Sequence, residues 1–379
     1  ILAQSCFSPR TLIMKRSENP RFTPRAFSFF GIALLFVLNT DALPQSPMGH
    51  GNVEGICVLQ HSSARASTLP LLQEIRPGPT LFIWHGERAD GKLEFMYKPM
   101  RRTLISGFGS YTNFSFWDSV DIQIIPRHTK VDNELLGRSF TPGSIFVWIG
   151  IAKEAEVPWA FLRQRGVYTI YYQTEPDSLG CSSQVDELWQ FSWRNLDDCR
   201  KIRNAPHQRF VPCGLDANSK KSRQLDQAIP NFFGMSRLRD CFADVNRSLQ
   251  GQLASTYGIW NDTAFENYMQ SHNIFINLHK RCSSRGSLET VRLSQLLSAN
   301  SLIISQNAFQ KDEEEYRGMV SFVPQSEIHN EFQRLASLSR VQRQEMAEQR
   351  GEMFSRKFDP AAIFERAGIY LMLDSFIDS

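Results

Sequence analysis

Short apolar runs alternate with helical segments in the first half of the chain. Four hydrophobic runs, each bounded by Gly, Pro or polar turns, predict buried strands at 80–84, 120–125, 144–149 and 167–172. A short helix is predicted at 159–165, because Gly166 offers a suitable helix end. Further helices are expected at 185–190 and 195–203, followed by a strand at 209–212. Such alternation is typical of a parallel α/β sheet.

The same alternation resumes after a polar connector at 216–227. Strands are predicted at 231–234, 273–278, 301–304 and 318–323. Helices are predicted at 237–253 and 288–297, and the charged segment 327–358 is expected to be largely helical. No internal repeat interrupts this order. The pattern therefore predicts two successive α/β halves joined by the connector.

The amino-terminal segment has the features of a secretory targeting sequence. An apolar run at 26–38 follows a basic flank, and the small residues Thr40 and Ala42 stand at the −3 and −1 positions of a cleavage site. About 13 apolar residues suit a signal peptide and fall short of the ~20 that cross a bilayer as a helix. Met14 is the expected start. A buried helix at the start of a domain is the alternative, and cleavage or retention as a short anchor stays open.

These signals predict an organisation in five parts. The expected parts are a signal peptide or short membrane anchor at 14–42, a stem or linker at 43–75, a first α/β domain at 76–215, a second at 216–358 and a C-terminal helix at 359–379.

Composition places the chain among ordinary globular proteins. Its 379 residues are 42% hydrophobic and 21% charged, which suits two or three domains and argues against wholesale disorder. A net charge of +3 gives no electrostatic argument for a nucleic-acid partner. The mean hydropathy of −0.31 excludes a protein that spans a membrane many times.

Cysteines and glycosylation sequons agree with an oxidising lumen. Three Asn-x-Ser/Thr sequons begin at Asn113, Asn246 and Asn261. Six cysteines follow the expected start, and an even number permits disulfides, although the sequence does not choose among 15 pairings. These are Cys57, Cys181, Cys199, Cys213, Cys241 and Cys282. No Cys or His spacing suggests a metal site.

Candidate chemistry gathers in the segment 273–306. Parallel sheets bind ligands at the carboxyl ends of strands, where loops lead into helix amino termini. Three such ends are expected to meet, after Gly234, at Leu278–Lys280 and at Ser305–Gln306. Glu289, Arg292 and Gln295 are expected on one side of the intervening helix. A carboxylate or amide there could bind a ribose diol, while Arg239, Lys280 and Arg292 could offset the charge of a diphosphate.

Each of these residues also has an ordinary structural interpretation. Glu289 and Arg292 could form a helical surface pair, and Arg239 could lie on an exposed helix face. His279 could be a hydrogen-bonded polar residue at a strand end.

The order of these motifs resembles the carboxyl-terminal domain of GT-B glycosyltransferases, in the group-1 branch that includes CgeB-type proteins. The resemblance covers roughly residues 140–358. It rests on five segments: Tyr172-Gln-Thr-Glu-Pro176, Val211-Pro-Cys-Gly214, Phe233-Gly234 followed by Arg239, Asn277-Leu-His279, and the stretch from Glu289 to Ser305. It implies an α/β protein of two Rossmann-like domains that face a cleft, with the donor in the second domain and the acceptor in the first.

The resemblance implies a nucleotide-sugar co-substrate and no tightly bound cofactor. The implied donor-binding residues are Gly234, Arg239, Lys280, Glu289, Arg292, Gln295 and Ser305. Glu175 and His279 are the catalytic candidates; Glu175 or Asp177 would serve as general base in an inverting enzyme, and both could equally be turn residues. No Asp-x-Asp motif marks a metal site at a strand end.

Three positions depart from the pattern of that family. Gln295 stands where the family has a ribose-binding Glu, Asn300 where it has a helix-ending Gly, and Gln306 where a Glu closes the strand. An amide can accept a hydrogen bond but lacks the strength of a carboxylate.

The leading hypothesis is therefore a transferase in the lumen of the secretory pathway, Golgi or ER, that moves a sugar to a glycan or protein hydroxyl. The departures motivate a second hypothesis, a non-catalytic carbohydrate-binding or scaffold protein with the same fold. A two-domain solute-binding receptor is a third, disfavoured by the charged helical segment 327–358.

Overall fold

The computed structural model describes most of the chain after residue 77. The described residues are 78–87, 92–117, 119–126, 140–150, 157–174, 181, 184–257, 259, 261–281 and 286–377. Residues 71–379 belong to one compact unit. The predicted targeting segment and stem, 14–75, lie outside the described residues. Within the described part, no helix combines the length and apolar character needed to cross a membrane.

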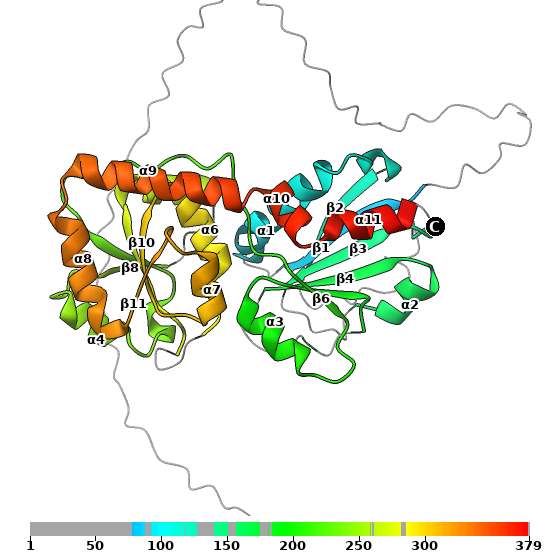
Figure 1. The fold of residues 1–379 in the computed structure, drawn as a ribbon, viewed down its shortest axis with the longest axis horizontal. Helices are drawn as coiled ribbons and strands as arrows, with labels where there is room; N and C mark the ends of the chain where they lie inside the picture. Colours follow the sequence, from blue (N-terminus) through cyan, green and yellow to red (C-terminus); the bar gives the residue numbers. More distant parts are fainter. Residues whose placement is uncertain are drawn as a thin grey trace, which may run out of the picture. The chain divides into compact units, whose positions relative to one another are not determined.

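Two parallel sheets organise the described chain (Figure 1). The first has the strand order β2-β1-β3-β4-β5-β6 and the second the order β11-β10-β9-β7-β8. The strands of the first sheet are β1 (Thr80–Glu87), β2 (Ser119–Pro126), β3 (Ile145–Gly150), β4 (Tyr168–Gln173), β5 (Glu187–Gln190) and β6 (His207–Phe210). Those of the second are β7 (Pro230–Phe233), β8 (Ala254–Thr256), β9 (Ile274–Asn277), β10 (Leu302–Gln306) and β11 (Ser321–Val323). We call the part built on each sheet the first lobe and the second lobe.

Helices cover both faces of each sheet (Figure 1). In the first lobe they are α1 (Lys92–Gly109), α2 (Trp159–Gln164) and α3 (Trp193–Arg200), with a 3-10 turn at Phe114–Phe116. In the second they are α4 (Phe242–Ser248), α5 (Asp262–Ser271), α6 (Thr290–Ser298), α7 (Gln310–Glu315), α8 (Ile328–Ser337) and α9 (Arg340–Lys357), with 3-10 turns at Ser236–Leu238 and Gln325–Glu327. Last come α10 (Pro360–Arg366) and α11 (Ile369–Ile377).

The buried side chains explain why the strands are continuous apolar runs. All six residues of β3 are buried, as expected for a parallel strand covered on both faces. One apolar cluster joins side chains of both lobes, including Leu104 of α1 and Leu293 of α6. Separate clusters fill the opposite faces of the two sheets. The lobes therefore share part of their core.

The C-terminal helices return to the first lobe. After α9, which packs on α6 and β10, the chain enters α10, and α10 packs on α1. Arg209 of β6 donates from Nη1 to the carbonyl oxygens of Ala367 (2.7 Å) and Gly368 (3.0 Å) between α10 and α11.

Most predicted strands are confirmed, and two element predictions are wrong. Residues 185–190 were expected to be helical, but 187–190 form β5, because a four-residue buried run between β4 and β6 is too short for a helix. The predicted helix 237–253 is a 3-10 turn followed by the shorter α4. Positive φ angles at Gln250 (56°) and Gly251 (77°) end that helical segment.

A disulfide joins Cys181 to Cys199 of α3, 18 residues apart. Cys213 is a free, fully buried thiol, and burial raises its pKa to about 12. Cys57 and Cys282 lie outside the described residues.

Candidate functional site

Three strands of the second sheet end at one edge, as predicted. In the strand order, β7, β9 and β10 are parallel neighbours, so Gly234, Leu278–Lys280 and Ser305–Gln306 follow adjacent strand ends. Helix α6 connects β9 to β10, and Glu289 stands at its N-cap. Its first-turn N–H groups therefore lie at the same edge, where they favour an anion.

Two arginines and one glutamate form an ion-paired triad at this edge. Arg239 Nη2 lies 2.6 Å from Glu289 Oε1, and Arg292 Nη2 lies 2.5 Å from Glu289 Oε2. The side chains are only 9% (Arg239), 15% (Arg292) and 21% (Glu289) exposed. Glu289 and Arg292 are therefore not a surface pair, and Arg239 is not on an exposed face. The triad carries a net charge of +1.

Both guanidinium groups are also held by other contacts. Arg239 Nε donates to the Leu278 carbonyl oxygen (2.9 Å), and Arg292 Nη1 donates to Asn277 Oδ1 (3.0 Å). Each guanidinium lies over the Phe232 ring, with Cζ-to-centroid distances of 5.8 Å for Arg239 and 5.5 Å for Arg292.

Gly234 leaves space for the guanidinium group of Arg292. Its φ is +151°, a conformation that L side chains rarely adopt, and a Cβ there would lie 3.1 Å from Arg292 Nη2. Glycine is therefore required both by backbone conformation and by the close approach of the guanidinium.

Ser305 contacts the triad indirectly, through Asn277. It is fully buried, and its Oγ accepts a hydrogen bond from Asn277 Nδ2 (3.0 Å) and donates one to the Gln306 carbonyl oxygen (2.9 Å). Asn277 in turn accepts from Arg292. Ser305 thus orients Asn277 rather than presenting its hydroxyl at the edge.

His279 is buried beside the triad. It is 3% exposed; its backbone N–H donates to Gln306 Oε1 (3.1 Å), and its Nε2 lies 3.1 Å from the Asn307 carbonyl oxygen. Burial lowers the pKa of the imidazole below its usual value, so the ring is neutral at pH 7. In that form Nε2–H donates to Asn307. This geometry favours a structural role, and the catalytic role of His279 stays a prediction. Lys280, the next residue, is exposed.

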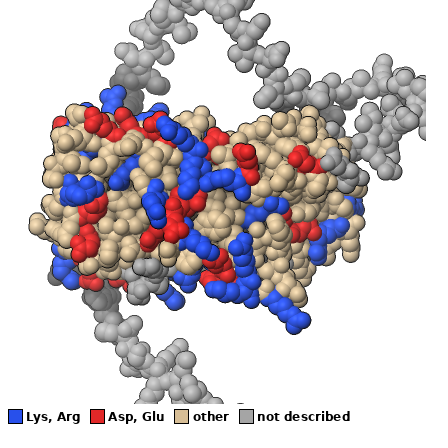
Figure 2. Space-filling model, in the orientation of Figure 1, with Lys and Arg blue, Asp and Glu red and all other residues tan. Residues whose placement is uncertain are grey.

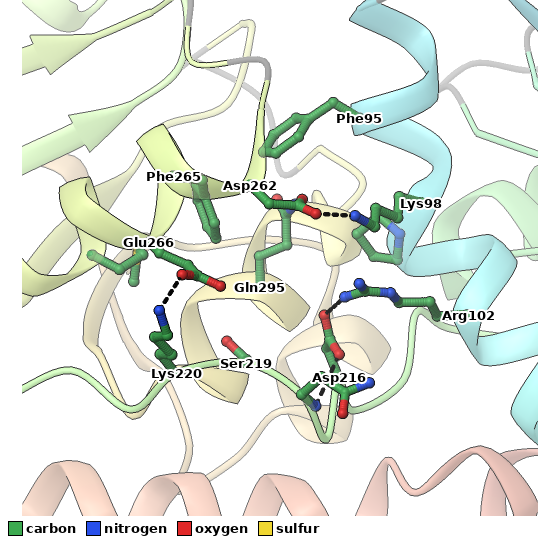
Figure 3. A pocket seen from close by; sticks show the side chains of 13 residues that line it. Phe95, Lys98, Arg102, Asp216, Ser219, Lys220, Asp262, Phe265, Glu266 and Gln295 are labelled. Atoms are coloured by element: carbon green, nitrogen blue, oxygen red, sulfur yellow. Dashed lines mark hydrogen bonds and ion pairs between the residues drawn. The ribbon is translucent and has the colours of Figure 1, made fainter. Parts of the chain in front are cut away.

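Gln295 lies apart from the triad. At about 100° per residue, a position six residues after Glu289 points to a different side of α6, so the expectation of a common face is wrong. Gln295 instead lines a pocket of about 130 Å³ between α1, the connector after Asp216, and α5 (Figure 3). Three ion pairs border this pocket: Lys98–Asp262, Arg102–Asp216 and Lys220–Glu266. The structure therefore separates Gln295 from the other predicted donor-binding residues.

The loop that enters α6 is tied to the first lobe. Asp312 of α7 accepts hydrogen bonds from Ser192 Oγ (2.7 Å), the Trp193 N–H (2.7 Å) and, at 3.4 Å, the Leu288 N–H. Burial raises the pKa of this carboxyl group to about 6. Sequence reasoning missed Asp312, because a polar helix beginning Gln310-Lys-Asp312 reads as solvent-exposed. It also missed Phe232, whose aromatic character beside Gly234 was the available signal.

The remaining catalytic candidates, Glu175 and Asp177, cannot be placed in the site. Glu175 and Asp177 lie outside the described residues. Among the described residues, no three His, Cys, Asp or Glu side chains are grouped so as to hold a metal ion.

Comparison with solved structures identifies the fold. HepE from Anabaena, solved in complex with UDP-glucose, aligns with 77% of this chain and 99% of its own length, at 10% identity and a TM-score of 0.50. The chain has a GT-B fold. TarM (7% identity, TM-score 0.46) aligns over 62% of this chain, and OtsA (11%, 0.45) over 78%. The chain spans 55% of the TarM chain and 93% of the OtsA chain.

At the level of sequence, no protein-family model and no curated protein matches the chain. The GT-B resemblance is thus confirmed as a fold, while the CgeB-like branch stays a prediction.

Proposed function

We propose that this GT-B protein is a glycosyltransferase that moves a sugar from a nucleotide-sugar donor to a hydroxyl of a glycan or protein. The observation that carries the proposal is the pair of guanidinium groups, Arg239 and Arg292, at the carboxyl edge of β7, β9 and β10 beside the start of α6. Such a pair matches the two negatively charged groups of a diphosphate.

The chemistry of glycosyl transfer explains why this charge is needed. The acceptor oxygen bonds to the anomeric carbon as the bond from that carbon to the diphosphate oxygen breaks. Negative charge grows on the departing diphosphate, and fixed positive groups stabilise it most in a site that excludes water. Arg239, Arg292 and the α6 amino terminus supply such charge without a metal ion, so we propose a metal-independent enzyme.

The first lobe is proposed to bind the acceptor and supply any base. The proton of the acceptor hydroxyl passes to a carboxylate in an inverting enzyme, and Glu175, two residues after the end of β4, is the proposed base. In the second lobe, Gly234, Asn277 and Ser305 set the arginine positions. HepE, which shares the fold, binds UDP-glucose, and this supports a nucleotide sugar as donor.

We propose a compartment in the secretory pathway, Golgi or ER. The Cys181–Cys199 disulfide is consistent with an oxidising lumen. Two sequon residues, Asn113 and Asn261, are exposed and accessible to glycosylation. The targeting segment at 14–42, cleaved or retained as a type II anchor, is part of the same proposal.

The test is a panel of nucleotide sugars given to the purified protein. We expect one nucleotide to raise the melting temperature and its sugar conjugate to yield free nucleoside diphosphate when an acceptor is present. Replacing Arg292 by Ala removes a charge-assisted contact worth about 1.5–3 kcal/mol, so nucleotide affinity should fall roughly 10- to 100-fold.

The control for Arg292→Ala is Arg247→Ala. Arg247 lies in the same lobe, but its side chain is 79% exposed, and its ion-pair partner in the described structure is Asp244 of the same helix, α4. Removal of Arg247 should therefore leave nucleotide affinity unchanged. Equal affinities for wild type and Arg292→Ala would contradict the proposed donor site.

The second candidate is a non-catalytic carbohydrate-binding or scaffold protein. Gln295 in place of a ribose-binding carboxylate, and its separation from the arginines, favour this alternative. It predicts neither thermal stabilisation by nucleotides nor nucleotide release with any donor.

A further inference from the structure

We infer that Glu289 is an internal counter-ion, which occupies the anion position between Arg239 and Arg292 and which a diphosphate must displace. The inference rests on the proposed function, because it specifies how the proposed donor site selects its ligand. Two asymmetries among the three side chains carry it.

The first asymmetry is that the arginines do not depend on Glu289 for their positions. Arg239 is anchored by the Leu278 carbonyl oxygen and Arg292 by Asn277, which Ser305 orients in turn. Both guanidinium groups also lie over Phe232. Each arginine therefore keeps an acceptor and an aromatic contact when the carboxylate leaves.

The second asymmetry is that, within the described part of the chain, Glu289 has no comparable anchor. It is the most exposed of the three side chains, at 21%, and both of its oxygens are directed to the arginines. Although Glu289 stands at the N-cap of α6, its side chain accepts no capping hydrogen bond from the helix. Rotation of this side chain breaks two ion pairs and leaves the helix start intact.

The charges explain what such a carboxylate does for selectivity. Glu289 already offsets one of the two guanidinium charges. A singly charged anion that displaces the carboxylate gains little, because the exchange replaces one negative charge by another. A diphosphate brings two or more charges and two sets of oxygens for the two guanidinium forks. Glu289 therefore makes the site prefer a diphosphate to a single phosphate.

The experiment is calorimetric titration with inorganic pyrophosphate and inorganic phosphate. Wild type should bind pyrophosphate in clear preference to phosphate. Glu289→Gln keeps the side-chain shape and removes the charge, so we expect roughly tenfold tighter pyrophosphate binding, which is the value of about one charge-assisted contact. The affinity for phosphate should increase by a larger factor than the affinity for pyrophosphate, so the variant should prefer pyrophosphate less strongly than wild type does.

Glu266→Gln is the matched control. It changes another ion-paired glutamate of the second lobe, bonded to Lys220 beside the pocket of Gln295, and should leave both affinities unchanged. If Glu289→Gln fails to fold, Glu289→Asp, which withdraws the carboxylate by one methylene group, should bind pyrophosphate more tightly than wild type.

Unchanged or weaker pyrophosphate binding by the folded Glu289 variant overturns the inference, because the carboxylate then does not compete with the anion. The outcome is separable from that of the proposed function. Tighter pyrophosphate binding without nucleotide release from any donor supports the counter-ion and contradicts the transferase. Nucleotide release together with unchanged pyrophosphate affinity of the Glu289 variant supports the transferase and contradicts the counter-ion.

Discussion

Two ion-paired glutamates of this chain differ in how firmly they are held. Glu187 of β5 is 2% exposed and accepts from Arg209 through both oxygens, at 2.7–3.0 Å, and from Trp189 Nε1 at 2.8 Å. Glu289 is more exposed, and its ion-pair partners among the described residues are the two arginines of the proposed site. A buried ion pair such as that of Glu187 is expected to stabilise the fold. A partly exposed pair such as that of Glu289 can be displaced by a ligand.

Loss of the Glu187 charge should therefore affect stability rather than ligand binding. Glu187→Gln leaves the Arg209 guanidinium buried without its counter-ion, and we expect the free energy of unfolding to fall by about 2–4 kcal/mol. Urea denaturation at pH 7 measures this. The control Glu352→Gln removes one partner of an exposed pair on α9 and should change stability by less than about 0.5 kcal/mol. Equal effects would contradict the structural role.

The same contacts predict the response of Glu187 to acid. Burial opposes its ionisation, but the hydrogen bonds from Arg209 and Trp189 outweigh burial, and its pKa lies below the usual value. A carboxyl whose folded pKa is depressed stabilises the protein above its unfolded pKa, about 4.3, and that stability is lost as the pH falls through the folded pKa. Wild type should thus lose more stability than Glu187→Gln between about pH 5 and pH 3.

Part of the candidate site could be predicted from the residue types along the sequence, and the rest was visible only in the contacts of the folded chain. Arg239, Glu289 and Arg292 could be predicted because each lies close to a strand end or helix start. The pairing of Glu289 with Arg292 was foreseeable as a contact three residues apart on one helix, but the pairing with Arg239 was not, because it joins residues 50 positions apart. The burial of His279 depends on Gln306 and Asn307 of another strand end.

At the scale of elements, helix α6 ends at a contact between two unusual residue choices. One is an Asn with a positive φ angle, and the other is a Gly inside the neighbouring helix α9. Asn300 adopts φ +56°, a left-handed conformation that Asn tolerates better than most residues. Gly351 of α9 lies against it, and a Cβ there would be 2.1 Å from Asn300 Oδ1. The amide in place of a helix-ending Gly is thus accommodated by a glycine in the neighbouring helix.

Helix α1 offers a test of the packing of the C-terminal helices. Alanine usually stabilises a helix relative to glycine, but a Cβ at Gly107 would lie 2.4 Å from the Phe364 ring of α10. We expect Gly107→Ala to lower the free energy of unfolding by about 1–3 kcal/mol. Gly109, in the same helix, has no atom within 4 Å of its Cβ position, so Gly109→Ala should be neutral or slightly stabilising. Denaturant titration compares them, and a stabilising Gly107→Ala would contradict the packing.

Local patterns identified long apolar strands better than interrupted helices. Strands such as 145–150 were predictable because every residue is buried. Helix α1 was not predicted, because Pro99 and two glycines interrupt its pattern, although packing on β1, β3, α6 and α10 stabilises it. Short β5 was mistaken for a helix because its side chains do not alternate.

At the scale of the whole molecule, the lobes are joined by polar contacts as well as by a shared core. Ser287 Oγ donates to Asn195 Oδ1 (2.7 Å), and Lys311 pairs with Asp197 (2.7 Å). Figure 2 shows basic and acidic side chains interspersed on the face drawn, consistent with such pairing.

Asp312 should give the junction a pH dependence. Its folded pKa, raised by burial to about 6, lies above the unfolded value of about 3.9, so stability falls as the pH rises from about 4 to 6. The integrated effect is on the order of 2–3 kcal/mol. Asp312→Asn should lack this loss, while Asp197→Asn, at a more exposed position of the same junction, should retain it. Urea denaturation across this pH range measures both, and parallel curves for wild type and Asp312→Asn would contradict the assignment.

The two parallel α/β sheets could be predicted because strand and helix alternation implies them, whereas the GT-B fold was expected from the resemblance of the motifs to that family. The lobe junction could not, because it depends on side-chain contacts between residues such as Ser192 and Asp312, 120 positions apart.

The most direct test of the donor site is a crystal structure of the protein with the nucleoside diphosphate that stabilises it most. We predict that the diphosphate lies between the guanidinium groups of Arg239 and Arg292, with the Glu289 side chain rotated away from both. A diphosphate bound elsewhere, such as in the pocket beside Gln295, with the triad intact, would contradict the proposed site.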